Sequence, residues 1–205
     1  MSEPTKQKIL AESLRLFSER GYDPVSVQDI AAAVGIKAPS LYNHYKSKEK
    51  IFEALMKATL VHYDEFTAGL SVHVDSPESD SDVFKSITVE RLTEKVKNIF
   101  TFTFKDEQIS QFRKMMTIEQ FRTPELSKLY NQRFIDRMIS YHQGIFEELI
   151  AAGRLKNLDA RTLALTYTSP LITLSGVCDR EPERFDECLE LLEKHVRLFF
   201  DTFNK

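Results

Sequence analysis

SVQDIAAAVGIKAPSLYNHYKSK, residues 26–48, has the pattern of two short helices joined by a tight turn. Ser26 is a favourable N-cap, and Asp29, three residues later, makes a variant of the capping box. Gly35 supplies the left-handed residue at which such a helix ends. The spacing i, i+3, i+4, i+7 predicts one buried face, formed by Val27, Ile30, Ala31 and Val34.

The second helix of the pair is predicted over 38–44, because Pro39 is tolerated in the first turn of a helix. Leu41 and Tyr45 lie at i, i+4 and are expected to face inward. Four polar side chains are then left facing outward, with Tyr42 toward one edge: Lys37, Ser40, Asn43 and His44. An amphipathic helix over 4–20 precedes the pair. Two short helices on a longer one form the helix-turn-helix arrangement.

The outward face carries groups that match DNA, since a helix fits the major groove and its outward side chains there meet base edges. The amide of Asn43 has the paired donor and acceptor that match adenine N6 and N7. Side chains that can reach base edges or phosphates are Gln28, Lys37, Ser40 and His44, and those suited to phosphate oxygens are Tyr42 and Lys48. The alternative is that this polar face is simply solvated, as in a generic three-helix bundle.

Residues 30–52, IAAAVGIKAPSLYNHYKSKEKIF, resemble the DNA-binding signature of the TetR (tetracycline repressor-like) family of transcriptional regulators. The resemblance covers about residues 6–60, and the family's pattern positions are occupied by Gly35, Leu41, Tyr42, Tyr45 and Lys48. It implies a recognition helix over 38–44, with phosphate contacts from Tyr42 and Lys48. The residues that it places toward the groove are Lys37, Ala38, Pro39, Ser40, Asn43 and His44. Asn43, and Ala38 with Pro39, depart from the residues frequent in the family, which bears on the operator sequence.

Composition fits an all-α protein of 205 residues, with only six glycines, seven prolines and 42% hydrophobic residues. The net charge is −3, yet residues 1–48 carry seven Lys/Arg against five Asp/Glu, which gives +2 and leaves −5 for the rest. Cys178 and Cys188 match no metal or redox spacing, and the five histidines show no mutual metal spacing. We therefore expect no metal and no cofactor.

The chain order predicts a helix-turn-helix domain over 1–47, a connecting helix over 48–72 and a helical body over 73–205. The acidic stretch 73–82 is expected to be a loop. Further helices are predicted over 83–104, 105–117, 124–152 and 182–203, and one that Asp159 caps, Pro170 interrupts and Gly176 ends. The fold prediction is all-α with about nine helices.

A ligand pocket in the body would use aromatic and methionine side chains, which line adaptable apolar cavities. The candidates are Phe100, Phe104, Phe112, Met115, Met116, Phe121, Phe134, Met138, Tyr141 and Tyr167. At helical spacing the same residues are typical of an ordinary core, and for any single one of them the core interpretation is favoured. Arg113, Arg122 and His142 are candidate anchors for a polar group of a ligand, or else pair between helices.

The uncharged run from Thr162 to Cys178 requires a partner over most of its circumference. Pairing of the last two helices, about residues 159–203, with their copies would give a four-helix dimer interface. These helices could instead form the core of a monomer. The family resemblance implies a two-fold homodimer, which a palindromic operator also requires.

Three functions compete. The first is a repressor that binds double-stranded DNA and is released by a small, largely apolar ligand. The second is a DNA-binding regulator that answers to a protein partner or to no ligand. The third is an enzyme, which no Gly-rich phosphate loop, nucleophile elbow or paired-carboxylate pattern supports. The N-terminal residues have no apolar segment typical of a signal peptide, and no run is long enough to span a membrane, so we expect a cytoplasmic protein.

Overall fold

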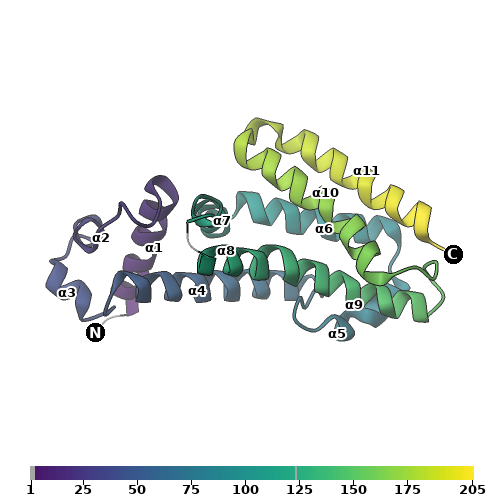
Figure 1. The fold of residues 1–205 in the computed structure, drawn as a ribbon, viewed down its shortest axis with the longest axis horizontal. Coiled ribbons are helices and arrows are strands. Elements are labelled where there is room, and N and C mark those ends of the chain that lie inside the picture. Colours follow the sequence, from purple (N-terminus) through teal and green to yellow (C-terminus); the bar gives the residue numbers. More distant parts are fainter. Residues whose placement is uncertain (1–2, 123) are drawn as a thin grey trace. The chain divides into compact units, whose positions relative to one another are not determined.

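The computed structural model describes residues 3–122 and 124–205, and over these ranges it is helical with no β-strand (Figure 1). The prediction of an all-α fold is confirmed, with ten helices in the described ranges when the continuous helical stretch 124–151 is counted once, against about nine expected. The chain divides into two compact units, which are described in turn. Unit 1 comprises Met1–Tyr63 with Lys105–Lys128, and unit 2 comprises Asp64–Phe104 with Leu129–Lys205.

Unit 1 contains the helix pair expected from the sequence together with one helix from much later in the chain. Its helices are α1 (Glu3–Arg20), α2 (Val27–Val34), α3 (Ala38–Tyr42), the part of α4 (Lys48–Gly69) up to Tyr63, and α7 (Glu107–Glu119). The core of unit 1 joins apolar faces of all these helices, as Phe17, Ile30, Leu41, Ile51 and Met115 are fully buried. Helix α7 thus belongs with the N-terminal helices, although the sequence order suggested a boundary near residue 72.

Helix α7 is fixed to α4 at its N-terminal end. The Asp106 side chain caps α7, because its Oδ1 accepts a hydrogen bond from the Ile109 amide at 2.9 Å. Its other oxygen lies 2.9 Å from Nε2 of His62 on α4. One turn away, the Gln108 amide donates to the Thr59 hydroxyl at 3.3 Å. These contacts hold the pKa of Asp106 below its usual range, although burial opposes them as the largest single influence.

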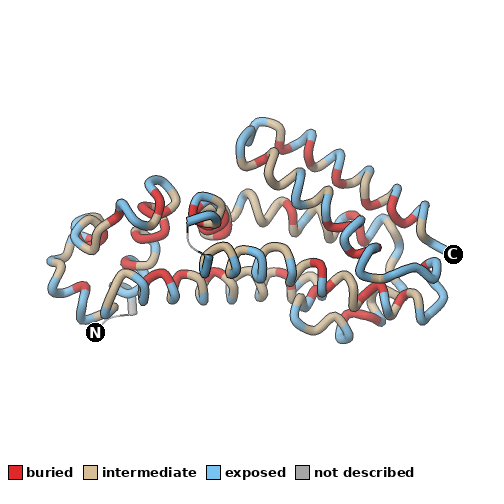
Figure 2. Tube along the Cα trace, viewed as in Figure 1, coloured by how far each residue is buried: buried red, intermediate tan, exposed pale blue. Residues whose placement is uncertain are grey.

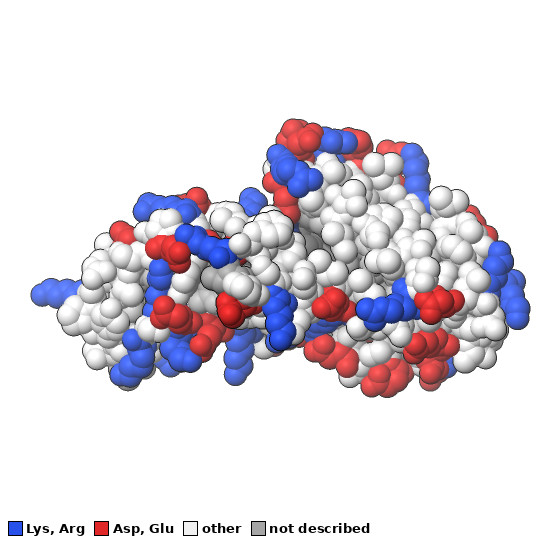
Figure 3. Space-filling view, in the orientation of Figure 1, with Lys and Arg blue, Asp and Glu red and all other residues white. Residues whose placement is uncertain are grey.

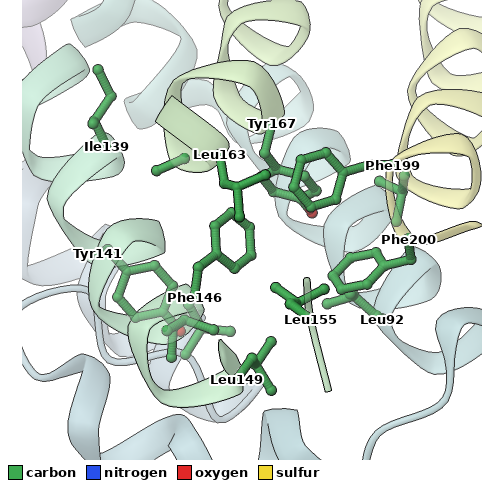
Figure 4. Packing of buried hydrophobic residues seen from close by; sticks show 14 residues of the cluster. Leu92, Ile139, Tyr141, Phe146, Leu149, Leu155, Leu163, Tyr167, Phe199 and Phe200 are labelled. Atoms are coloured by element: carbon green, nitrogen blue, oxygen red, sulfur yellow. The ribbon is translucent and has the colours of Figure 1, made fainter. Parts of the chain in front are cut away.

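Unit 2 is built from the remaining helices, and α10 and α11 lie side by side in opposite directions (Figure 1). These are α5 (Pro77–Ser86), α6 (Val89–Lys105), the π-helix η1 (Asn131–Asp136), α9 (Arg137–Ala151), α10 (Ala160–Arg180), the 3₁₀-helix η2 (Pro182–Arg184) and α11 (Phe185–Phe203). Helix α8 (Pro124–Tyr130) is divided between the units, because its residues up to Lys128 belong to unit 1. Buried positions recur along one side of the longer helices (Figure 2). In Figure 4, Phe146 and Leu163 lie between Tyr141 on one side and Phe199 and Phe200 on the other.

Three helix predictions for the body need correction. Residues 77–86 form α5 and not a loop, because Pro77 stands in the first turn and Glu78 and Asp80 favour the positive end of the helix. The predicted helix over 83–104 is accordingly split into α5 and α6. Helix α10 is not interrupted at Pro170 but continues to Arg180. A single proline removes only one backbone bond, which packing against neighbouring helices can offset.

Asp80 anchors α5 to α9 in the interior of unit 2. Its side chain is 1% exposed and accepts a hydrogen bond from the Tyr141 hydroxyl at 2.7 Å. It also accepts from the backbone amide of His73 at 2.6 Å, and its second oxygen lies 2.6 Å from Nδ1 of His73. Burial and this carboxylate raise the pKa of Tyr141 far above its ordinary value, so the phenol stays a donor.

Replacing Gly144 with alanine should destabilise unit 2 where α5 crosses α9. A Cβ at Gly144 would lie 2.7 Å from Cγ of Pro77, and the stiff proline ring cannot retreat as a flexible side chain would. We expect a loss of about 1–2 kcal/mol in the free energy of unfolding, measured by urea denaturation. Gly69→Ala is the matched control, because no atom lies within 4 Å of its added Cβ. Equal stability of the two variants would contradict this close packing.

Candidate nucleic-acid interface

Helix α2 is capped at both ends by residues adjacent to it in the sequence. The Ser26 hydroxyl accepts from the Asp29 amide at 3.1 Å, and the Ser26 amide donates to the Asp29 carboxylate at 2.8 Å. The Ser26 hydroxyl also donates to the Asp29 carboxylate, and this bond together with that from the Ser26 amide holds the pKa of Asp29 below its usual range. At the other end Gly35 has φ +82°, and its amide donates to the Ala31 carbonyl at 3.0 Å. The capping box and the glycine stop predicted from the sequence are both present.

Helix α3 is short and presents a polar outer face. It begins after Lys37, has Pro39 in its first turn and ends at Tyr42, two residues before the predicted end. Leu41 is fully buried, so it holds the helix against unit 1 as expected. The residues exposed on and around α3 are Lys37, Pro39, Ser40, Tyr42 and Asn43, while Ala38, His44 and Tyr45 are half-buried.

Two further residues complete the predicted interface. Gln28 is exposed on α2, which places its amide on the surface of the same motif. The imidazole of His44 is less available than expected, since its Nδ1 atom is buried and has no hydrogen-bond partner. In Figure 3 the surface over α2 and α3 is largely uncharged, with lysine or arginine side chains projecting near it. The arrangement can offer hydrogen bonds and positive charge to a polyanion.

Lys48, at the start of α4, is hydrogen-bonded within the protein. Its ammonium donates to three backbone carbonyls, those of Tyr22 at 2.9 Å, Asp23 at 3.3 Å and Val25 at 2.9 Å. It also lies 4.2 Å from the centre of the Tyr22 ring. An ammonium has three N–H donors, so the carbonyls use all of them. The sequence contains no local signal for this arrangement, because the partners lie 23 to 26 positions away.

The proposed ligand-lining residues do not converge on one site. Phe112, Met115 and Met116 are buried in unit 1, whereas Tyr141 and Tyr167 belong to the main core of unit 2. In unit 2, Phe100 lies in a second, smaller cluster, Phe104 packs against that cluster, and Phe134 and Met138 are half-buried. Phe121 is 87% exposed and therefore lines no enclosed pocket in this structure. Most of these side chains therefore occupy ordinary core positions, which was the alternative to a pocket.

The three proposed polar anchors each have a structural environment of their own. Arg113 is buried on α7. Arg122 pairs with Asp23 and Glu119. Nδ1 of His142 lies 2.8 Å from the Met138 carbonyl, and desolvation lowers the pKa of His142 to about 4. Since the neutral ring has one N–H, the carbonyl fixes it on Nδ1.

A crevice in unit 2 lies outside all of these predictions. Its cavity volume is about 30 Å³, which is room for about one water molecule. Its walls come from Phe84, Ile87, Thr88, Val89, Leu92, Leu149, Arg154, Leu155, Phe200 and Asn204. Sequence periodicity carries no signal for it, because its walls come from three separated segments, 84–92, 149–155 and 200–204.

The fold and the outward face of α3 define a helix-turn-helix protein with a helical second unit. The profile of the bacterial regulatory proteins of the tetR family matches residues 9–55. The profile of the C-terminal domain of AefR-like transcriptional repressors matches residues 90–171. The chain belongs to the TetR family. This is a family of transcriptional regulators, so the enzyme hypothesis is set aside.

Two relatives of known function match between a quarter and a third of the chain. The biofilm operon icaADBC negative transcriptional regulator IcaR of Staphylococcus aureus is 48% identical over 52 residues, which are 25% of this chain and 28% of IcaR. The same regulator of Staphylococcus epidermidis is 39% identical over 61 residues, 30% of this chain and 33% of that protein. The matched segment thus spans about a third or less of each relative.

Solved structures match over the whole chain at low identity. A TetR-family regulator from Mesorhizobium loti has a TM-score of 0.69 at 16% identity and covers 100% of both chains. SmeT, the repressor of the Stenotrophomonas maltophilia multidrug efflux pump SmeDEF, has a TM-score of 0.69 at 17% identity, over 98% of this chain and 90% of SmeT. A complex of SmeT with triclosan has a TM-score of 0.68 at 16% identity, over 99% of this chain and 93% of SmeT. These similarities concern the fold. In the described residues no helix is long and apolar enough to cross a membrane.

Proposed function

We propose that this TetR-family protein is a transcriptional repressor that binds a palindromic operator as a homodimer. The observation that carries the proposal is α3, whose apolar side is buried through Leu41 while its polar side is exposed. IcaR, which is 48% identical to this chain over 52 residues, is a negative transcriptional regulator. Two copies of α3 would enter successive major grooves, with half-sites about 34–36 Å apart.

Within this proposal each exposed residue of the motif has a role. Asn43 reads a base through its amide, and Ser40 and His44 add hydrogen bonds at base edges. Tyr42 and Lys37 contact phosphates, and Lys37 lies next to the free amides at the start of α3. Ala38 and Pro39 offer apolar contact in the groove, and Gln28 approaches from α2. Lys48, at the start of α4, is a further candidate for a phosphate contact.

The proposed dimer surface lies on α10 and α11. Leu165 and Ile172 are 51% and 36% exposed on α10, and Leu191 and Leu198 are 43% and 66% exposed on α11. Between the two α10 residues, the exposed Ser169 hydroxyl donates to the carbonyl of its own helix four residues earlier, at 2.7 Å. A polar group satisfied in this way costs little to remove from water. This surface therefore favours a second copy of the chain.

We also propose that a small, largely apolar molecule bound in unit 2 releases the operator. SmeT, which shares the fold, has been solved with triclosan. The crevice in unit 2 combines apolar walls with the polar groups of Arg154 and Asn204, and its cavity of about 30 Å³ would have to widen to admit such a molecule. A thermal-shift screen of hydrophobic compounds tests this step, because a ligand that binds only the folded state raises the melting temperature.

Substitutions of Asn43 and Tyr42 should separate base reading from phosphate contact. The duplex is first selected from a random-sequence pool with the unmodified protein. Asn43→Ala should then cost about 1–3 kcal/mol on that duplex and relax the preference at one position of each half-site. Tyr42→Phe should weaken binding to all duplexes by a similar factor, since a phosphate contact carries no sequence information. Fluorescence anisotropy titrations measure both effects.

Two outcomes would contradict this scheme. If Asn43→Ala keeps both the affinity for the selected duplex and the base preference in each half-site, Asn43 on α3 does not contact a base. Failure of the unmodified protein to enrich any duplex would overturn the proposed function itself. Glu53→Gln is a suitable control, because Glu53 lies on the exposed side of α4 and pairs only with Lys50 among the described residues.

A further inference from the structure

Helix α7 carries a row of exposed side chains on the side opposite its buried residues. Lys114 and Ile118 lie four residues apart on α7, and Phe121 follows three residues later in the turn after the helix. This spacing places the three side chains, the α7 row, on one side of the helix. Ile118 is 53% exposed and Phe121 is 87% exposed. Two neighbouring apolar side chains left in water, unlike a single one, point to an interaction surface.

The end of α7 that leads to Phe121 is fixed within unit 1. Glu119 is 0% exposed, and its carboxylate accepts a hydrogen bond from the Tyr22 amide at 2.8 Å. Arg122 donates to both oxygens of this carboxylate at 3.0 and 3.1 Å and also pairs with Asp23 at 2.8 Å. The backbone on either side of Phe121 is therefore already ordered, so a contact at its ring costs little further conformational entropy.

The operator proposed above brings two copies of unit 1 close together. A compact unit of about 87 residues has a radius of gyration of about 12 Å, which corresponds to a sphere about 31 Å across. The half-sites of the operator are about 34–36 Å apart. Two copies of unit 1 centred at this spacing are separated by only a few ångströms, a gap that side chains projecting from both copies bridge. A second copy of unit 1 is therefore the partner that the operator itself supplies.

The α7 row is chemically complementary to itself under a two-fold axis, at which both copies contribute the same residues. If the two α7 helices meet antiparallel with the axis beside Ile118, this residue meets its own copy and Lys114 lies opposite the partner's Phe121. An ammonium is attracted to the face of an aromatic ring. Arg122, the other cation next to Phe121, is already paired with two carboxylates and adds no unpaired charge to the contact.

We propose that Lys114, Ile118 and Phe121 form a second contact between the two protomers, which their DNA-binding units make when both occupy the operator. The partner of the α7 row is the α7 row of the other protomer. This contact is separate from the dimer surface proposed on α10 and α11, and it makes binding at the two half-sites cooperative. The proposal rests on the proposed function, because the palindromic operator is what brings the two copies of unit 1 together.

Cross-linking on DNA tests whether the two α7 rows meet. Ile118→Cys places a thiol beside the two-fold axis, within reach of the equivalent thiol of the partner. We expect mild oxidation to give a disulfide-linked dimer about tenfold or more faster on the selected palindromic duplex than on a duplex with one half-site scrambled, measured by non-reducing gel electrophoresis. Val61→Cys is the matched control, because Val61 is 47% exposed on α4 and lies outside the α7 row. The unmodified protein should not cross-link, since Cys178 and Cys188 are buried.

Phe121→Ser tests the contribution of the contact to binding. Fluorescence anisotropy gives the affinity of each protein for the palindromic duplex and for the duplex with a single half-site. We expect Phe121→Ser to lower the affinity for the palindrome about fivefold or more and to leave the affinity for the single half-site unchanged. The melting temperature of the free protein should also stay the same, because Phe121 is 87% exposed. Val61→Ser, which removes an exposed apolar side chain elsewhere in unit 1, should change none of these quantities.

Three results would overturn the proposal. If Ile118→Cys cross-links no faster than Val61→Cys, or equally fast on both duplexes, the α7 rows do not meet on the operator. If Phe121→Ser keeps the full preference for two half-sites over one, the contact adds nothing to binding. If Phe121→Ser instead lowers the melting temperature of the free protein and keeps that preference, the Phe121 ring packs within its own chain.

These outcomes are distinguishable from failure of the proposed function. If the unmodified protein enriches no duplex, or one without two-fold symmetry, the proposed function is wrong, and no variant is needed to show it. If the unmodified protein binds a palindrome, the cross-linking of Ile118→Cys and the affinities of Phe121→Ser decide whether the α7 row joins the two protomers there.

Discussion

Replacing Leu165 and Ile172 together with glutamate should convert the protein to a monomer and weaken operator binding by about 10²–10⁴-fold. Both side chains lie on the exposed side of α10, and no charged residue stands between Arg161 and Asp179. Two glutamates from each protomer would meet across a two-fold interface, where like charges cannot leave water without a large cost. Each DNA-binding unit would then have to bind its half-site alone.

The mass should be measured by size-exclusion chromatography with light scattering, and the affinity by titration of the selected duplex. Val61→Glu is a matched control, because Val61 is 47% exposed on α4 and lies outside the proposed dimer surface. We expect the control to keep both the dimer mass and the affinity. A dimeric double variant with full affinity would show that the protomers associate elsewhere.

The second large effect concerns pH and depends on His142. Its ring lies 4.8 Å from that of Tyr167 and 5.2 Å from that of Tyr141, centre to centre. Desolvation among these rings lowers the pKa of His142 to about 4, below its ordinary value of 6.5. Between these two values the unfolded chain binds a proton that the folded protein does not, so stability rises with pH in this window.

We expect His142 to cost the folded state up to about 3 kcal/mol as the pH falls from 7 to 4. His142→Phe keeps a ring of similar size and cannot be protonated, so this part of the pH dependence should vanish. Urea denaturation of both proteins at several pH values measures the difference between their curves. Parallel curves from pH 7 to 4 would mean that the imidazole is protonated in the folded protein.

The local elements of the DNA-binding motif were predictable from sequence. The Ser26 capping box, the Gly35 stop and the buried Leu41 all depend on residues within a few positions of one another. Local propensity and spacing fix such features without knowledge of the rest of the fold. The exposed face of α3 follows from the same periodicity, because burying one side of a short helix leaves its other side in water.

The sequence misled where a local signal competed with a longer-range contact. The acidic residues 77–82 suggested a loop, yet Asp80 enters the core and bonds to Tyr141. Pro170 suggested an interruption of the helix, yet α10 continues through Pro170 to Arg180, where packing against neighbouring helices offsets the lost backbone bond. Aromatic and methionine side chains suggested a pocket, yet periodicity cannot distinguish a residue that lines a cavity from one that fills a core.

The sequence by itself determined that this protein is helical, that it carries a helix-turn-helix motif and which side chains of that motif face outward. Only the tertiary structure placed α7 with the motif, engaged the ammonium of Lys48 within the protein and buried Glu119 against Tyr22. The Tyr22 and Glu119 bond joins residues 97 positions apart. The physical reason is that caps and amphipathic faces are formed within one or two helical turns, whereas a buried ion finds its partners only when distant helices pack together.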